Sequence, residues 1–150
     1  MARWADLEAA DPSLAATARG RLVEDPSRPP ILATVRDGAA PRLHPVNVGI
    51  VDGALWTFVG PSAKLRDLLE DGRYALHGWV DPDHPVEASV RGRAMRVEDP
   101  ERRAAVAATW AFEPDEAFRL FELHLESAVI GARETADDWP PAYRRWSAPS

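Results

Sequence analysis

The clearest chemical signal in the sequence is the pair Ser62 and Lys64, which directly follows a Gly60-Pro61 break. Residues 54–59 before the break are rich in strand formers, and residues 62–70 after it have the apolar spacing of a short helix. A helix start offers free backbone N–H groups and the positive end of the helix dipole, so the hydroxyl and the ammonium would complete a phosphate-binding group. On the alternative interpretation, Ser62 only caps the helix and Lys64 is only solvated. The glycine and lysine spacing of a P-loop is missing.

Other reactive side chains form no pattern of comparable strength. The four histidines lack metal-ligand spacing, so we expect no metal site. They are His44, His77, His84 and His124. No order of serine, histidine and acid suggests a hydrolase, and Asp137-Asp138 lies in a polar tail without a motif. Arg91, Arg93 and Arg96 offer either a basic patch for an anionic substrate or an ordinary solvated strand face.

Composition limits the classes of function. The chain has 150 residues, no cysteine and a formal net charge of −6 at pH 7. This length predicts one domain with a real core that needs no metal or disulfide. The negative charge argues against a nucleic-acid binder, and the lack of cysteine fits a reducing compartment. Residues 1–10 are too polar for a signal peptide and no stretch could span a membrane, so we expect a cytoplasmic protein.

The order of elements predicts the fold class. Helices are expected from Asp11 to about Glu24, over residues 62–70, and from Asp99 to about Trp110, with one more turn or two from residue 113. Six strands are predicted, over residues 31–35, 42–51, 54–59, 73–80, 86–97 and 120–130. We therefore expect an all-β fold with flanking short helices, a six-stranded antiparallel Greek-key split β-barrel whose closure removes the sheet edges. Residues 1–150 would form one domain, with a helical segment over 1–25 and an extended tail over 137–150.

Alternation assigns side chains to the two faces of the strands. In strand 42–51 one face carries His44, Val46, Val48 and Ile50, and the other carries Leu43, Pro45, Asn47 and Gly49. Strand 42–51 then enters a tight hairpin at Asp52-Gly53. In strand 120–130 one face carries Phe121, Leu123, Leu125 and Val129, and the other carries Glu122, His124 and Glu126.

The run PRLHPVNVGIVDGALWTFVGPSAKLRDLLEDGRYALH combines a Pro-Val strand, a D-G hairpin, a Ser-x-Lys helix start and a D-x-R-x-A-L strand. In this order it resembles the FMN-binding split-barrel family, of the pyridoxamine 5'-phosphate oxidase-like, actinobacterial type. The resemblance covers about residues 30 to 130. It implies a flavoprotein that holds FMN at the interface of a homodimer and acts on a small molecule.

The resemblance also implies which residues bind the cofactor. Ser62 and Lys64 would meet the 5'-phosphate, and Arg42 would be a second phosphate or ring contact. Glu87 would approach the ring edge. The wall against the flavin would come from two strands: Arg42, Leu43, His44, Pro45, Val46 and Asn47 on one, Thr57 and Phe58 on the other. Trp139 and Trp146 in the tail either reach the partner's flavin or pack on their own chain.

Departures from the family pattern concern the substrate. The Ser-Arg-Pro-Arg and Arg-x-His motifs of true pyridoxamine phosphate oxidases are missing, so we expect a different small organic substrate. Glu87 stands where the family often has glutamine. Three functions stay open: an FMN-dependent oxidoreductase, a reductase that uses the deazaflavin coenzyme factor 420, and a non-catalytic flavin or haem carrier.

Overall fold

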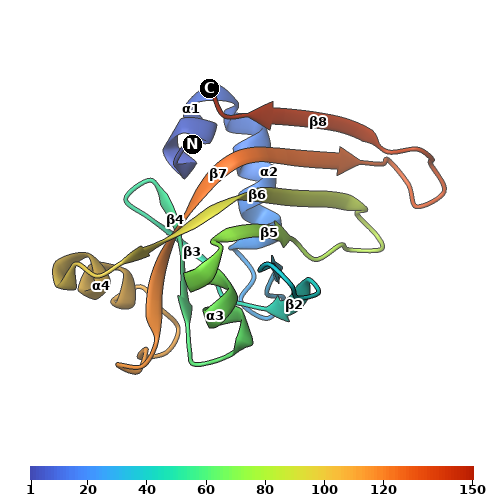
Figure 1. Cartoon of the computed structure of the whole chain (residues 1–150). Coiled ribbons are helices and arrows are strands. Elements are labelled where there is room, and N and C mark those ends of the chain that lie inside the picture. Colours follow the sequence, from blue (N-terminus) through green and yellow to red (C-terminus); the bar gives the residue numbers. More distant parts are fainter.

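The computed structural model describes all of residues 1–150, and its centre is one curled antiparallel sheet (Figure 1). The helices are α1 (Trp4–Ala10), α2 (Pro12–Leu22), α3 (Ala63–Glu70) and α4 (Pro100–Ala107). The strands are β1 (Ile31–Thr34), β2 (Arg42–Pro45), β3 (Gly49–Val51), β4 (Ala54–Val59), β5 (Arg73–His77), β6 (Val86–Val97), β7 (Arg119–Ala132) and β8 (Ala142–Ser147). They lie in the order β2-β1-β5-β6-β7-β4-β3, and β8 pairs with β7. None of the helices has the length and apolar character needed to cross a bilayer.

The predicted split barrel with short flanking helices is confirmed, with eight strands instead of six. The predicted strand 42–51 is divided, because β2 pairs with β1 whereas β3 pairs with β4. Residues 46–48 carry the chain from one part of the sheet to the other, and the tail adds β8. The end strands β2 and β3 do not pair with each other, so the sheet curls without closing and the expected closure is wrong.

A β-bulge in β7 changes which side chains face the core. Gly92 pairs with Leu125 while Arg91 pairs with Ser127, so Glu126 has no opposite residue. The extra residue reverses the alternation beyond it. Ala128 and Ile130 are therefore buried, and the expectation that Val129 shares the face of Leu125 is wrong.

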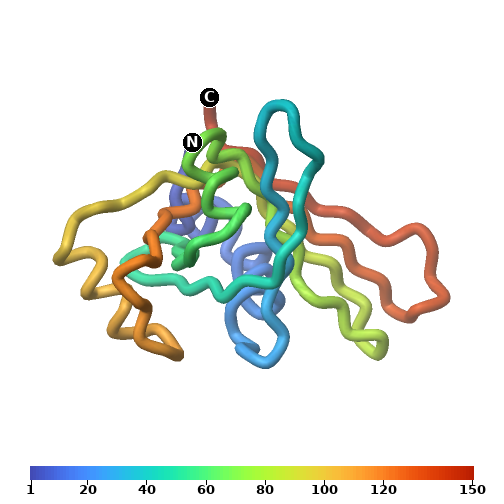
Figure 2. The backbone as a smooth tube through the Cα atoms, turned by 60° about the horizontal axis from the view of Figure 1, so that its bottom comes forward, coloured from blue at the N-terminus to red at the C-terminus, as the bar shows by residue number.

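Two apolar clusters hold the sheet and the helices together. The larger one packs α1 and α2 against one face of the sheet, with Trp4, Leu7 and Leu125 fully buried. The smaller one lies beneath α4 and includes Trp56 and Phe58. Figure 2 shows the neighbouring N- and C-terminal ends of the chain, which the first cluster and strand β8 bring together.

α1 lies within the helical segment predicted for residues 1–25, whereas several element ends differ from the prediction. At the start of α1, the backbone N–H of Arg3 donates to the Asp6 carboxylate at 2.7 Å. α2 and α4 begin at their predicted caps but end at Leu22 and Ala107, and residues 113–118 form turns without a helix. β5 ends at His77, and the next residue, Gly78, lies against α2, where a Cβ would stand 2.8 Å from the Arg21 carbonyl oxygen.

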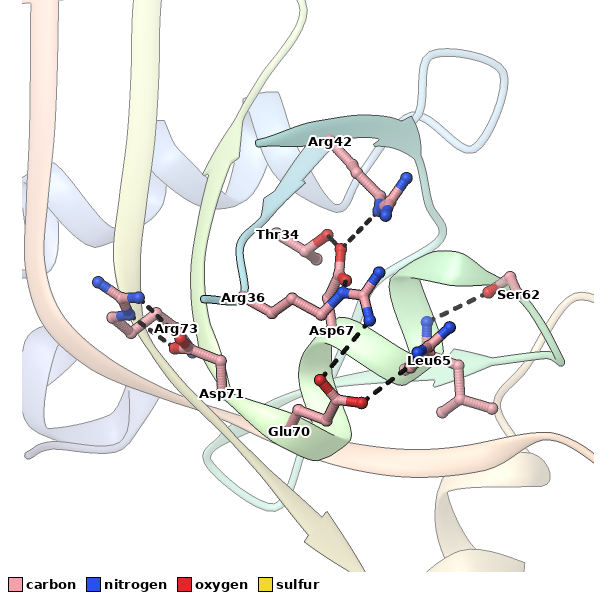
Figure 3. A network of polar contacts seen from close by, with 10 residues as sticks. Thr34, Arg36, Arg42, Ser62, Leu65, Asp67, Glu70, Asp71 and Arg73 are labelled. Carbon is pink, nitrogen blue, oxygen red and sulfur yellow. Dashed lines mark hydrogen bonds and ion pairs between the residues drawn. The ribbon is translucent and has the colours of Figure 1, made fainter. Parts of the chain in front are cut away.

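The turn between α3 and β5 carries an ion pair that links stability to pH. Arg73 Nε and Nη2 donate to the two carboxylate oxygens of Asp71 at 2.6 and 2.7 Å (Figure 3). These hydrogen bonds lower the pKa of Asp71 from 3.8 to about 2.

A folded-state pKa below the unfolded value means that the stabilisation by Asp71 is complete above about pH 4 and is lost as the pH falls through about 2. Urea unfolding at pH 5, 3 and 2 should therefore show a smaller acid loss in Asp71→Asn than in the wild type. Because Asp11, Asp25 and Asp81 also have lowered pKa values, the test is the difference between the two proteins. Identical pH profiles would contradict a stabilising role for this pair.

Candidate functional site

The start of α3 has the local geometry predicted for it. Ser62 accepts a hydrogen bond from the Leu65 backbone N–H at 3.2 Å and donates one to the Gly60 carbonyl oxygen at 2.9 Å. The serine hydroxyl is therefore a helix cap, and it stays exposed. Lys64 is half-buried and forms no hydrogen bond or ion pair within the chain. Its ammonium group is free to meet an anion.

A buried carboxylate stands behind this helix start. Asp67, on α3, is 1 % exposed and accepts hydrogen bonds from Thr34 Oγ1 at 2.7 Å and from Arg42 Nε at 3.0 Å. Arg36 Nε lies 3.1 Å from the other carboxylate oxygen without making a hydrogen bond to it. Figure 3 shows these three side chains converging on Asp67 from β1, from the residues after it, and from β2. One aspartate therefore holds two arginines beside α3.

The group as a whole keeps an excess of positive charge. Arg42 uses only Nε for Asp67, so both of its terminal nitrogens lack a partner, and its side chain is 33 % exposed. Arg36 Nη1 and Arg66 Nε lie 3.7 and 3.3 Å from the Glu70 carboxylate. Together with the unpaired lysine described above, four cations thus face two carboxylates. This excess extends along α3 from Lys64 to Glu70, and an excess of cations favours binding of an anion such as phosphate.

Sequence reasoning missed Arg36 and Asp67. A signal for Asp67 was present, because it follows Lys64 by three residues and so shares its side of the helix, next to the buried Leu68. A charged residue at an inward position requires a partner of opposite charge. Nothing in the local pattern indicated Arg36, because its contact with Asp67 depends on how α3 docks against β1.

Residues 42–47 lie as the alternation predicted. Arg42 and His44 are half-buried and Val46 is buried, whereas the residues between and beyond them are exposed: Leu43, Pro45 and Asn47. Leu43 is 71 % exposed, an unusual position for a leucine. The Nε2 atom of His44 is buried without a hydrogen-bond partner. Residues 42–47 therefore present Leu43 and Pro45 outward, and Arg42 reaches α3 through its contact with Asp67.

The two candidates on β4 are buried. Thr57 is inaccessible to solvent, and its hydroxyl donates to the Asn47 carbonyl oxygen at 2.8 Å, which ties β4 to the segment between β2 and β3. Phe58 is 6 % exposed and packs edge-on against Trp110 with ring centroids 5.1 Å apart, and Arg103 covers its ring. Access to Phe58 therefore depends on its two neighbours.

Glu87 lies elsewhere on the sheet. It pairs with Gly131 at the far end of the β6 and β7 ladder, next to Tyr143 on β8. It forms no hydrogen bond or ion pair with any residue of α3. The structure therefore brings together Arg42, Ser62 and Lys64 around α3 and leaves Glu87 apart from them within one chain.

No protein-family model matches the sequence, and no curated protein matches it. Solved structures do match the fold. PhzG from Burkholderia lata 383, in complex with tetrahydrophenazine-1-carboxylic acid, has a TM-score of 0.62 at 16 % identity, over 96 % of this chain and 86 % of its own. General Stress Protein 26 from Bacillus anthracis str. Sterne has a TM-score of 0.59 at 17 % identity, over 89 % and 95 %.

A heme binding protein from Mycobacterium smegmatis has a TM-score of 0.57 at 21 % identity, over 77 % of this chain and 51 % of that one. At these identities the likeness establishes the fold. The chain shares the split-barrel fold of these proteins, so the resemblance seen in the sequence is confirmed at the level of fold.

Proposed function

We propose that this protein binds FMN through its 5'-phosphate at the start of α3 and works as a flavin-dependent oxidoreductase. The observation that carries the proposal is the unpaired ammonium of Lys64 beside the Ser62 cap, in a group with more cations than carboxylates. A phosphate monoester carries the negative charge and the acceptor oxygens that would balance the cations around α3.

The residues present fit such a cofactor. Lys64 and the free terminal nitrogens of Arg42 would hold the phosphate, and Ser62 would join them by turning its O–H from the Gly60 carbonyl oxygen to the phosphate. The outward side of residues 43–47 would lie along the ring. When bound, FMN supplies the redox chemistry, and the protein contributes binding, orientation and exclusion of water. The substrate is proposed to be a small organic molecule other than pyridoxamine phosphate.

A homodimer is part of the same proposal. No helix covers the outer face of β1 and β2, where Ile31 and Leu43 are 40 % and 71 % exposed. A second copy that covers this face would bury these side chains and enclose a ring lying on β2. Glu87 and Trp139 belong to parts of the chain that lie apart from α3. In the dimer, these residues of one protomer would approach the cofactor held by the other. We propose that this homodimer is cytoplasmic.

Lys64→Ala is expected to weaken FMN binding by about 1.5–3 kcal/mol, roughly 10- to 150-fold in Kd, because a charge-assisted hydrogen bond to phosphate is lost. Fluorescence titration of the apoprotein measures this change. Riboflavin, which lacks the phosphate, should bind the variant and the wild type equally. Arg73→Ala is the matched control, since this exposed arginine follows the other end of α3 and is already paired with Asp71. Unchanged FMN affinity in Lys64→Ala would overturn the role of Lys64.

The colour and bound ligand of the purified protein distinguish the three functions that the sequence leaves open. A yellow preparation that releases FMN on denaturation supports the proposal, and turnover with NAD(P)H then separates an enzyme from a carrier. A colourless protein that binds added deazaflavin coenzyme supports the reductase alternative. Bound haem would support the carrier alternative, in line with the heme binding protein of the same fold.

A further inference from the structure

A small cleft on the sheet brings together two arginines from distant parts of the chain. It has a volume of about 160 Å³ and is lined by Arg91 of β6, Arg145 of β8 and side chains that lie between them on β5, β6 and β7. The other two arginines of β6 are engaged elsewhere, Arg93 with a backbone carbonyl oxygen and Arg96 with a carboxylate. Of the three arginines on this strand, Arg91 is therefore the one that meets a cation from another strand in a common cleft.

The register of the strands directs the lining side chains to one face of the sheet, and α1 and α2 pack against the other face. In adjacent antiparallel strands, directly opposite residues lie on the same face. Arg91 is opposite Ser127 of β7, and Arg145 is opposite Val129 of the same strand. β6 and β8 lie on either side of β7, two strand spacings or about 10 Å apart. Both long arginine side chains can therefore reach a ligand that lies over β7.

Several hydrogen-bond donors of the cleft have no partner within the chain. Arg91 Nε donates to Ser127 Oγ at 3.1 Å, which orients the guanidinium group and leaves both terminal nitrogens free. Because Ser127 Oγ accepts this hydrogen bond, its own O–H remains able to donate to a ligand. Arg145 forms no hydrogen bond or ion pair through its side chain, and the Ser89 hydroxyl forms no hydrogen bond. The cleft thus offers two guanidinium groups and two hydroxyl groups.

The charge of the cleft is positive although the chain as a whole is acidic. Its seven lining residues include two arginines and no aspartate or glutamate, in a chain with a formal net charge of −6. The acids of these strands nearest to it in the sequence are Glu87 on β6 and Glu126 at the bulge of β7, and neither forms an ion pair with Arg91 or Arg145. A local excess of positive charge attracts an anion.

The size and the lining of the cleft favour one kind of anion. Pockets for drug-sized ligands measure about 300–1,000 Å³, so a volume of about 160 Å³ suits a small molecule. Guanidinium groups bind carboxylates and phosphates through paired N–H donors. The half-buried side chains of Ala75 and Val129 line the same cleft and offer apolar contact beside these donors. A small organic acid matches both features, whereas inorganic phosphate matches only the charge.

We propose that this cleft binds a small organic acid, with the carboxylate at Arg91 and Arg145 and the apolar part against Val129. The cleft shares its face of the sheet with Leu43, from which a row of opposite residues runs through β1 and β5 to Arg91. As the place that holds the acid group of the flavin's substrate, the cleft rests on the proposed function; as a binding site for an organic acid it does not.

Titration of the full-length protein with benzoate, with benzamide and with inorganic phosphate tests this proposal. Benzoate and benzamide share a ring and differ in charge, whereas phosphate carries charge without an apolar part. Chemical-shift changes of the backbone amides of Ser89 and Ser127 in NMR spectra report binding in the cleft. Benzoate should bind at least about tenfold more tightly than benzamide, because only its carboxylate forms charge-assisted hydrogen bonds with both arginines. It should also bind more tightly than phosphate.

Two variants of neighbouring residues assign the binding to the cleft. Arg145→Gln removes one guanidinium group and should weaken benzoate binding about three- to tenfold, with benzamide changed less than about twofold. Arg144→Gln is the matched control, because Arg144 is opposite Ile130, on the other face of β8, and pairs with Asp11 at 2.8 Å. This variant should leave benzoate binding unchanged. Unaltered amide signals outside the cleft establish that both variants are folded.

Equal affinity for benzoate and benzamide, tighter binding of phosphate than of benzoate, or equal effects of the two arginine variants would overturn the cleft proposal. Lys64→Ala provides the cross-check, because it should weaken FMN binding and leave benzoate binding unchanged. A protein that binds benzoate in the cleft but no FMN would contradict the flavin proposal alone. A protein that binds FMN without preferring benzoate to benzamide would contradict the cleft proposal alone.

Discussion

Replacement of Asp67 by alanine is expected to lower the free energy of unfolding by about 2–4 kcal/mol, because it removes the buried carboxylate that accepts from Thr34 and Arg42 and forms an ion pair with Arg36. Thr34 is inaccessible to solvent, so its hydroxyl would lose its only partner. Arg36 and Arg42 are 19 % and 33 % exposed, so water would recover part of their solvation and keep the loss below that of a fully buried pair. In thermal unfolding this corresponds to a fall in Tm of roughly 5–15 °C.

Glu70→Ala is the matched control for Asp67. Glu70 lies on the same helix and also approaches Arg36, but its side chain is 52 % exposed. Exposed pairs contribute little, so this variant should lose less than about 0.5–1 kcal/mol. Chemical denaturation of both variants in parallel measures the difference. Equal losses would contradict the view that Asp67 holds the arginines in place.

Gly92→Ala is expected to be at least as damaging, with a loss of about 3–5 kcal/mol in the free energy of unfolding. A Cβ at Gly92 would overlap the His124 carbonyl oxygen and stand 3.0 Å from the Glu126 backbone nitrogen. Both are backbone atoms at the bulge of β7, so neither can rotate away as a side chain could. The bulge would have to rearrange, and with it the register that buries Ala128.

Gly20→Ala tests whether the effect belongs to the bulge or to glycine replacement in general. Gly20 lies within α2, and a Cβ there would meet nothing closer than 3.9 Å. Alanine favours the helix, so this variant should be more stable than the wild type by about 0.5–1 kcal/mol. Opposite signs in urea unfolding are the expected result. A neutral Gly92→Ala would show that the close approach at the bulge does not constrain the fold.

Local chemistry in the sequence was sufficient for many elements. β4 and β6 have the predicted bounds, and positive φ values at Asp52 and Gly53 confirm the tight hairpin. Ser62, Asp11 and Asp99 each cap a helix as their types predict. These features depend on a few neighbouring residues, so a single sequence contains the information for them.

Features that depend on distant partners could not be predicted. Strand 42–51 is divided because its first half pairs with β1 and its second half with β4. The alternation of side chains does not predict which strand is the partner. The bulge at Glu126 likewise reflects the register against β6. At the site, the helix start was sufficient to predict Ser62 and Lys64. The contact between Arg36 and Asp67 depends on how α3 packs against β1, which local sequence does not specify.

Lys64 has a chemical consequence beyond ligand binding. All seventeen other basic residues apart from histidine are arginines, so its side chain carries the one primary amine besides that of the N-terminus. Reagents that acylate amines leave guanidinium groups intact, and they would modify this protein at a single side chain. A fluorophore or solid support joined there is attached at one defined point of the surface, beside the first turn of α3.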